Sequence, residues 1–166
     1  GANEAIRIDA DPTDAQYVAE EIAKIAVGYD LILTGRESID YNGGVVCGML
    51  GSLLGITSIN VVTRIDYADG KFSFDRDIDG GRETVSCAGP CVASAQKELC
   101  EPRIPNMRGI MAARTKPLQV LAPQAAANFA NYASYELPVA KTGVRLIDAS
   151  DAGKLIDILR NEAKVI

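Results

Sequence analysis

The residues with the clearest binding chemistry lie in one loop, from Gly35 to Cys47, between an apolar strand and a helix. Leu31 to Leu33 is a continuous apolar run, typical of a parallel strand with helices over both faces of its sheet. Ligands of α/β proteins bind where such strands end, and the amides of the following helix favour a phosphate. Gly43-Gly44 allows the backbone to approach a ligand closely. From the residues alone, a phosphate-binding loop and a plain strand-to-helix turn are equally good interpretations.

Side chains suited to catalysis are scarce. The chain has no histidine, so neither a Ser-His-Asp nor a Cys-His site can form within it. It also lacks a Walker loop and a Gly-x-Gly-x-x-Gly sequence. Asp75, Asp77 and Asp79 alternate and would share one strand face, which suits either a cation or, as we favour, solvent. The loop from Gly35 to Cys47 is therefore the one segment whose residues suggest a specific binding mechanism.

The four cysteines are Cys47, Cys87, Cys91 and Cys100. An even count is compatible with disulfides, but a chain of this size without a visible secretion signal favours reduced, packed thiols. The spacing of Cys87 and Cys91 would suit half of a metal site. Because there is no histidine, and because Cys47 and Cys100 lack zinc-type pairing, we predict no metal site.

Composition indicates a globular chain and excludes several classes of protein. With 166 residues, of which 48% are hydrophobic, one domain with a sizeable core is the default. A net charge of −5 and a pI of about 4.8 argue against nucleic acid as a partner. No apolar run approaches the roughly 18 residues of a membrane span, and no signal peptide is visible at the first residues.

The first half of the chain alternates between strand and helix patterns. A short strand at 5–8 precedes a helix that begins at Pro12 or Thr13, because Gln16 follows Thr13 at capping-box spacing, and that stops at Gly28. A strand at 31–33, a helix from Val45 to Leu54 ending at Gly55, and a strand at 59–65 follow. The stretch 71–95 is rich in β-formers, with a tight turn predicted at Asp79-Gly80-Gly81.

Beyond Pro102 the pattern weakens, because five prolines divide the chain up to Pro138. Residues 118–121 form a candidate strand, and residues 125–135 are either a helix or an ordered excursion. The last helix is predicted to begin at Asp148 or Ser150. Its apolar stripe is expected to be buried and consists of Leu155, Ile156 and Leu159.

The stretch from Arg76 to Ser94 contains a pattern that bears on the interpretation of the whole chain. It places a basic residue, an acid, a glycine pair, a second acid and a proline at fixed distances: Arg76, Asp79, Gly80, Gly81, Glu83, Val85, Pro90, Val92 and Ser94. This order resembles the signature of the electron transfer flavoprotein β subunit. Phe74 and Ala93 depart mildly from it, since each stands where an aliphatic residue is usual.

The resemblance extends over nearly the whole chain. It includes the strand and loop from Asp30 to Asp40, Glu101-Pro102-Arg103, the sequence Gly109-Ile110-Met111, and Lys141 to Val144 before the closing helix. Even Gly1-Ala2-Asn3 is similar to an internal sequence of the family. About the first third of a complete β subunit is therefore expected to be missing, which indicates a fragment, a processed product or an unusually short relative.

The resemblance implies that the loop holds the phosphate of AMP, or a second FAD in electron-bifurcating members. Carried over by position, the candidate residues are Gly35, Ser38, Ile39, Asp40, Tyr41, Asn42, Gly43, Gly44, Val45, Val46 and Cys47. The sequence departs from the family here, because Val45 and Val46 stand where Gln and Thr or Val are usual. We therefore expect this chain to bind AMP or FAD weakly or not at all, through backbone amides alone.

The resemblance also implies that residues 101–113 dock into a partner dehydrogenase through one apolar anchor. By register the anchor is Met107, where leucine is usual, and its candidate neighbours are Arg108, Ile110 and Met111. Methionine is flexible and suits an adaptable anchor. The alternative is that Met107 and Met111, four residues apart, simply pack a short helix. Arg103, Arg108 and Arg114 make the segment locally basic, which would steer it to an acidic partner.

We expect an α/β fold with a partly parallel nucleotide-binding-type sheet flanked by helices, an added antiparallel β-hairpin region and a C-terminal helix. One domain is predicted, with a body at 1–121 and a C-terminal arm and helix at 122–166. The resemblance implies a partnership with an α subunit that carries FAD, and electron transfer between flavin dehydrogenases and an acceptor, in the cytoplasm or the mitochondrial matrix. The candidate surfaces for the α subunit are the last helix, with its apolar stripe, and the segment from Pro123 to Pro138. The alternative is a non-redox adenine-nucleotide-binding module of the universal-stress type.

Overall fold

The structure is a computed structural model that describes residues 2–39, 41–97, 99–124, 128–141 and 143–166. Its contacts divide the chain into two compact units, residues 1–132 and residues 133–166. The boundary at 121/122 between body and arm stays a prediction. We describe the two units separately.

The first unit contains seven strands and three helices among the described residues. They are β1 (Ala5–Ile8), α1 (Ala15–Ile25), β2 (Leu31–Gly35), α2 (Val46–Leu54), β3 (Thr57–Ala68), β4 (Lys71–Ile78), β5 (Gly81–Cys87), β6 (Cys91–Ala95), α3 (Met107–Arg114) and β7 (Leu118–Leu121). Every strand predicted from the sequence is present, and α2 ends as expected, with Gly55 in the left-handed conformation at a φ of 65°.

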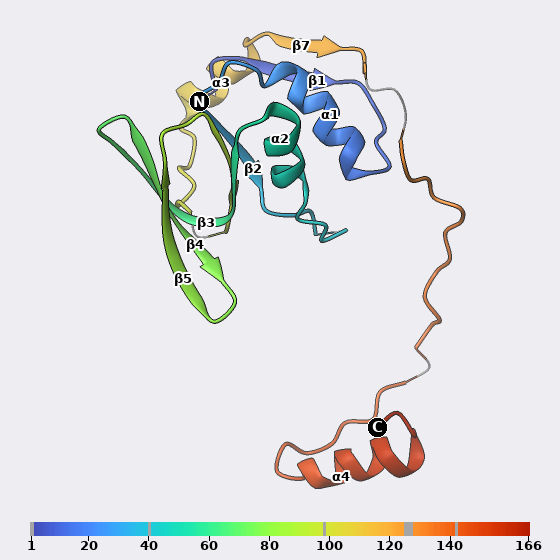
Figure 1. Cartoon of the computed structure of the whole chain (residues 1–166). Coiled ribbons are helices and arrows are strands. Elements are labelled where there is room, and N and C mark those ends of the chain that lie inside the picture. The colour runs from blue at the N-terminus through green and yellow to red at the C-terminus, as the bar shows by residue number, and fades with distance from the viewer. Residues whose placement is uncertain (1, 40, 98, 125–127, 142) are drawn as a thin grey trace. The chain divides into compact units, whose positions relative to one another are not determined.

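Five of these strands form a mixed sheet in the order β2-β6-β3-β4-β5 (Figure 1). β2, β6 and β3 are parallel, whereas β4 and β5 run as an antiparallel hairpin from the end of β3. The expectation of a partly parallel sheet with an added hairpin is confirmed. The carboxyl ends of β2 and β6 lie side by side, since Gly35 pairs with Ala95.

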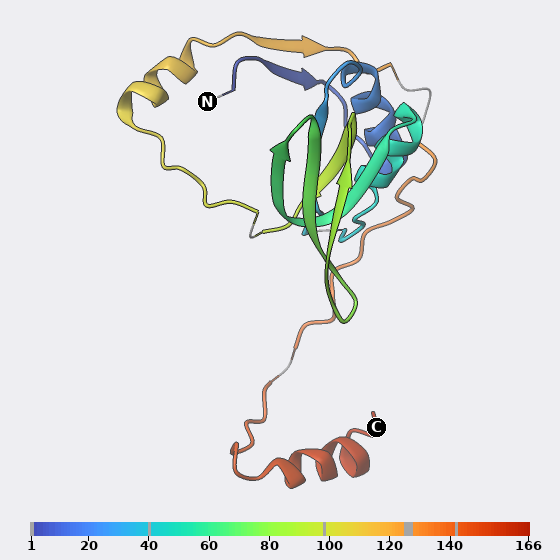
Figure 2. The same cartoon turned by 60° about the vertical axis from the view of Figure 1, so that its left-hand side comes forward.

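A second, smaller sheet joins the two ends of the first unit. β1 and β7 pair in parallel, with Ala5 opposite Leu118 and Ile8 opposite Leu121, and both figures of the ribbon show them side by side (Figure 2). The pairing brings together strands more than a hundred positions apart in sequence, so residues before α1 and after α3 are fixed by one another.

Helices α1 and α2 cover one face of the parallel strands (Figure 1). The core between them and the sheet is made of buried Ala19, Cys47, Leu50 and Val92, with Ile32 partly buried against it. The helix lies very close to β3, because a Cβ added to Gly51 would stand 2.7 Å from the Cβ of Ser58. Glycine at this position therefore allows α2 to seat on the sheet.

The opposite face of the sheet has a core of its own strand residues. Ile59, Val62, Phe74, Cys91 and Ala93 are buried there, and the partly buried residues against them come from β2, β4 and β5 as well as from Leu99. The expectation that helices cover both faces is wrong for the described residues, since the sheet curls over this face instead. Leu33 lies on β2, the edge strand of the sheet, and is 54% exposed.

The signature string forms the β4–β5 hairpin, as predicted. Arg76 pairs with Glu83 across the two strands, with 3.1 Å between Nε and Oε1, and Arg82 donates to Asp77 over 3.2 Å. The Thr84 hydroxyl donates to Asp75 over 2.6 Å. These cross-strand pairs set the register of the hairpin. Asp75 and Asp77, two of the three alternating aspartates, therefore have partners within the hairpin. Among the described residues, no group of three or more His, Cys, Asp or Glu side chains could hold a metal ion.

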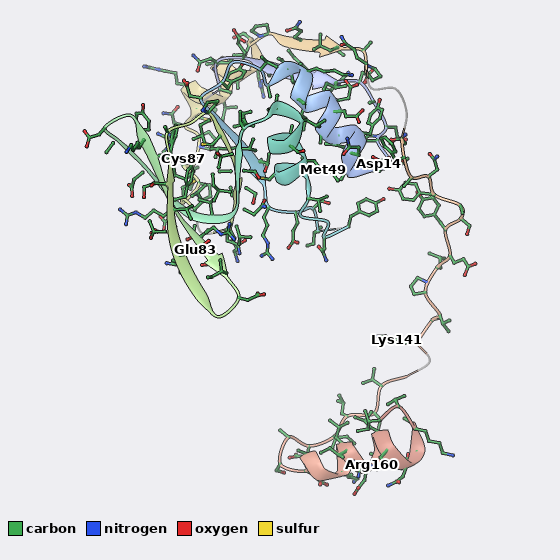
Figure 3. The ribbon with its side chains drawn as sticks, in the orientation of Figure 1. Asp14, Met49, Glu83, Cys87, Lys141 and Arg160 are labelled. Atoms are coloured by element: carbon green, nitrogen blue, oxygen red, sulfur yellow. The ribbon has the colours of Figure 1, made fainter. Side chains whose placement is uncertain are left out.

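Helix α1 begins two residues later than predicted. Its N-cap is Asp14, whose carboxylate accepts a hydrogen bond from the Tyr17 amide at 2.8 Å. The expected cap, Thr13, is used elsewhere, because its hydroxyl donates to the Ala130 carbonyl over 2.5 Å. The second carboxylate oxygen of Asp14 accepts from the amides of Phe129 and Ala130. Asp14 therefore caps the helix and also holds the segment that follows β7 (Figure 3).

These bonds predict a pH dependence. The hydrogen bond from Tyr17, followed by those from the 129–130 segment, lowers the pKa of Asp14 below its ordinary value. A lowered pKa in the folded state means that the carboxylate stabilises the fold above about pH 4 and that this contribution disappears as the pH falls through the lowered pKa. We expect Asp14→Asn to reduce the melting temperature at neutral pH and to flatten its decline in acid.

Thermal unfolding followed by circular dichroism between about pH 3 and pH 7 measures this effect. Asp11→Asn is the matched control, because Asp11 is an exposed residue in the same loop. Equal acid dependence in the Asp14→Asn variant and the natural chain would contradict the assignment.

Among its described residues, the second unit has one helical segment. It comprises α4 (Ala152–Asp157), whose N-cap is Asp151 rather than the predicted Asp148 or Ser150, and the π-helical turn Ile158–Glu162. Asp148 instead accepts from the Ser150 amide at 2.9 Å, in the turn before the helix. The stripe expected to be buried is not buried within this unit, because Leu155 and Ile156 are exposed and Leu159 is half-buried.

For residues 125–135 the sequence predicts either a helix or an ordered excursion. Residues 125–127 lie outside the described residues, and residues 128–135 have no helix. The alternative of an ordered excursion fits the hydrogen bonds that tie Asn128 and Ala130 to Thr13. In the part of the chain that the structure describes, none of the helices has the length and apolar character needed to cross a bilayer.

Candidate functional site

The candidate site is the loop between β2 and α2. The strand ends at Gly35, and the loop turns back on itself where the Asn42 amide donates to the Ser38 carbonyl over 2.8 Å. Asn42 and Gly44 both have positive φ, at 49° and 61°. The Cβ that a side chain at Gly44 would add lies 3.8 Å from the Arg36 carbonyl, so the two ends of the loop are close together. Asp40 lies outside the described residues.

The side chains of the loop point mainly to solvent. Ile39 is 96% exposed, and Tyr41 and Val45 are also exposed. Tyr41 stacks on Tyr132, with ring centroids 6.1 Å apart and planes 14° apart, and the two hydroxyls share a hydrogen bond. The sequence gives no local signal for this contact, which brings a residue from the far end of the first unit to the loop.

The N-terminus of α2 carries no side-chain cap within the described residues. Its N-cap is Val45, whose apolar side chain offers no acceptor to the first-turn amides. The first turn of any α-helix leaves its amides without intrahelical partners, and they carry a partial positive charge. This end of α2 therefore presents backbone donors of the kind that bind phosphate.

Cys47 belongs to the core rather than to the surface of the site. Its side chain is buried, and the thiol donates to the Ile59 carbonyl over 3.6 Å. Burial raises the pKa of the Cys47 thiol, so it stays protonated at neutral pH. Of the candidate residues, Cys47 can thus offer a ligand its amide but not its sulfur.

Ser94, a residue of the signature string, pairs with Thr34 just before the loop begins, and its polar contacts could not be predicted from the sequence. Ser94, buried at the end of β6, accepts a hydrogen bond from the Val61 amide at 2.9 Å, and its hydroxyl lies 3.4 Å from Asn60 Oδ1. Val61 has a φ of 61°, which is unusual for a β-branched residue, and the β3 register shifts at this bulge. Ser94 therefore holds strained backbone next to the carboxyl end of the sheet.

Arg36 is a second residue missing from the sequence-based set. It follows β2 directly, and its Nη1 lies 3.5 Å from Oε1 of Gln96, which follows β6. Its Nε lies 3.8 Å from the Glu37 carboxylate, and both side chains are partly exposed. A guanidinium at the loop entrance is suited to an anionic ligand. Its position could have been noticed from the sequence, since a basic residue at a strand end is a visible signal.

Two hollows of the first unit lie away from this loop. One, of about 370 Å³, is lined by the ends of α1 and α2 and by Pro90, at the opposite end of the parallel strands. The other, of about 790 Å³, is lined by α3 and the residues before it, including Arg103, Ile104, Ile110 and Arg114. Neither hollow is lined by the described residues of the loop.

Helix α3 contains the predicted docking residues. Its N-cap Asn106 accepts from the Gly109 amide at 2.8 Å, and none of the helix residues is buried. Met107 is 73% exposed, and Arg108, Ile110 and Met111 are exposed as well. The alternative that Met107 and Met111 pack a short helix into a core has no support in this geometry. The assignment of a docking role stays a prediction.

The geometry defines an α/β module of the nucleotide-binding type. It has a parallel core, a loop with free helix amides at the carboxyl end of that core, and an exposed apolar helix beside a basic hollow. The chain has no histidine, so a general base within it would have to be another type of side chain.

Comparison with known proteins identifies the family. A family model described as the electron transfer flavoprotein domain matches residues 1–126. The electron transfer flavoprotein subunit beta of Syntrophomonas wolfei is 32% identical over 99% of this chain and 68% of its own length. The corresponding proteins of Bradyrhizobium diazoefficiens and Homo sapiens are 29% and 30% identical, over 69% and 51% of their lengths and 100% and 74% of this chain. The chain belongs to the electron transfer flavoprotein family, with the β subunits, as the signature predicted.

Proposed function

We propose that this chain acts as the β subunit of an electron transfer flavoprotein, in a heterodimer with an α subunit that carries FAD. The pair passes electrons between flavin dehydrogenases, such as the acyl-CoA dehydrogenases of fatty-acid oxidation, and an acceptor. FAD supplies the redox chemistry, and this chain supplies binding surfaces and electrostatics.

The observation that supports the proposal most directly is the apolar surface of the second unit. Large apolar side chains along residues 133–146 are almost fully exposed: Leu137, Val139, Val144 and Leu146. Leu155 and Ile156 on α4 are exposed too. Large apolar side chains exposed along one segment are expected where another protein covers them. A family whose members form pairs with an α subunit accounts for it.

The proposal assigns two further roles to the first unit. The Gly35–Cys47 loop is the candidate phosphate site for AMP or a second FAD, and α3 is the candidate docking element for the dehydrogenase. The loop fits a phosphate only in part. The α2 amides and the Arg36 guanidinium suit an anion, whereas Val45 and Val46 provide no polar side chain. We therefore assign no electron-transfer step to a nucleotide in this chain.

A non-redox adenine-nucleotide-binding module is the competing hypothesis. It predicts tight nucleotide binding by the chain alone and no flavoprotein partner. The signature hairpin, the family match and the exposed surface of the second unit favour the electron-transfer role.

Co-expression with an electron transfer flavoprotein α subunit tests the proposal. We expect an equimolar yellow complex on size-exclusion chromatography, because the α subunit brings FAD and covers the exposed apolar surface. Replacing Leu137 and Val139 together by serine should weaken the complex, whereas Leu53→Ser, on an exposed part of α2 in the first unit, should not. Two colourless proteins that elute separately would count decisively against the assignment.

A further inference from the structure

Two cysteines outside the candidate site lie next to one another. Cys87 ends β5 and Cys91 begins β6, with Ala88-Gly89-Pro90 between them. Cys91 is buried in the cluster around Phe74, and Cys87 packs against the same cluster from its edge. Cys87 is near enough to Cys91 to raise the pKa of the Cys91 thiol. None of the roles proposed above uses this pair.

The curl of the sheet explains how the two thiols meet. β5 and β6 are not neighbours in the strand order, because β3 and β4 stand between them. The turn that joins them packs tightly, since a Cβ added to Gly89 would lie 3.1 Å from the Phe72 ring and 3.5 Å from the Asp30 carbonyl. The Cys91 amide donates to the same carbonyl over 3.1 Å. The curled sheet and this turn therefore fix the position of both cysteines.

We propose that Cys87 and Cys91 form an oxidation site, in which a peroxide converts the two thiols into an intramolecular disulfide. Cys87 is the partly exposed member and can meet a small oxidant, whereas Cys91 is enclosed. The site is separate from the nucleotide loop and from α3, and the inference stands whether or not the proposed function is correct.

The chemistry balances with one peroxide. The Cys87 thiolate attacks an oxygen of the peroxide, forming an S–O bond and breaking the O–O bond, and the released hydroxide takes a proton to become water. The Cys91 sulfur then attacks the Cys87 sulfenic acid, forming the S–S bond and breaking the S–O bond. The departing hydroxide takes the Cys91 proton and leaves as a second water.

The surroundings of the pair assign the two roles. Burial, together with the hydrogen bond and the charge of Cys87, raises the pKa of the Cys91 thiol to about 12. Cys91 therefore keeps its proton at neutral pH, which leaves Cys87 as the attacking sulfur. Once Cys87 has become a neutral sulfenic acid, its charge no longer raises the pKa of the Cys91 thiol, and the neighbouring Cys91 sulfur can act as the resolving cysteine.

The other cysteines are poorly placed to compete. Cys47 is buried in the core under α1 and α2, on the helix-covered face of the sheet. Cys100 is exposed and has no place in the Phe74 cluster. Cys100 is therefore expected to react with alkylating agents freely and to serve as an internal reference for oxidant exposure.

Peptide mapping of the whole chain tests the proposal. Tryptic cleavage after Arg82 and Lys97 places Cys87 and Cys91 on one peptide, with Cys47 and Cys100 on others. After hydrogen peroxide treatment and alkylation, we expect this peptide to be lighter by two hydrogens and to carry no alkyl group. After reduction it should carry two alkyl groups.

The Cys100→Ser variant should give the same result, whereas Cys91→Ala should abolish the internal link. The natural chain alone decides the matter if Cys91→Ala fails to fold. A Cys87–Cys100 link, a sulfinic acid on Cys87 beside a free Cys91, or two unreacted thiols after Cys100 has oxidised would each overturn the proposal.

Discussion

Replacing Val45 by Gln and Val46 by Thr is expected to convert a weak or absent AMP site into a measurable one. Both positions lie at the start of α2, where free amides already face the loop. A hydrogen bond to a charged group contributes about 1.5–3 kcal/mol, so each bond gained to a phosphate should tighten the dissociation constant about tenfold or more. Isothermal titration calorimetry with AMP, on the natural chain and the double variant, measures the difference.

The control variant carries the same new side chain at a different position of α2. Leu53→Gln places the same side chain on the same helix, at a residue about as exposed as Val45 but near the helix C-terminus. That end carries the negative pole of the helix, so it should not gain affinity for phosphate. A micromolar or tighter site in the natural chain would show that amides and Arg36 suffice. An unchanged affinity in the double variant would place the phosphate elsewhere.

The parts of the fold that sequence predicts well are those fixed by near neighbours. Asp79 and Gly80 lie between two runs of β-formers, and a two-residue turn with Gly80 at a φ of 84° joins β4 to β5 there. Gly55 ends α2 for an equally local reason. In both cases the residues that determine the geometry lie within a few positions of one another, so the pattern contains the necessary information.

The errors come from contacts between distant residues. Thr13 has capping-box spacing, yet Ala130 takes its hydroxyl and Asp14 becomes the cap, over a separation of 117 positions. The bulge at Val61 depends on Ser94 in another strand. Tyr132 reaches the loop only because the segment after β7 returns along α1. No periodicity along the chain encodes such contacts.

The predicted burial of the last helix is not met within its own unit, and the reason is a different one. A period of apolar residues shows that a face will be covered but does not show by what. The stripe at Leu155 and Ile156 has no cover within its own unit. On the proposed function the α subunit covers it, so the pattern reports an interface rather than an intramolecular core.

The same reasoning applies to α3 and leads to the second large effect. Met107 begins this helix with 73% of its surface exposed, next to a hollow lined by Arg103 and Arg114. An exposed methionine adds little to the free energy of folding but can fill a pocket of a partner, and the arginines favour an acidic rim around that pocket.

We expect Met107→Ala to slow electron transfer with the partner dehydrogenase about tenfold at limiting concentration, because truncating an interface anchor costs roughly 1–2 kcal/mol of binding. Flavin content and melting temperature should not change. Stopped-flow reduction of the α-subunit flavin by a reduced dehydrogenase measures the rate. Val27→Ala is the matched control, because Val27 is 72% exposed and follows α1, outside the docking segment. If Met107→Ala instead lowers the melting temperature by many degrees and leaves the transfer rate unaltered, Met107 stabilises the fold and the dehydrogenase docks elsewhere.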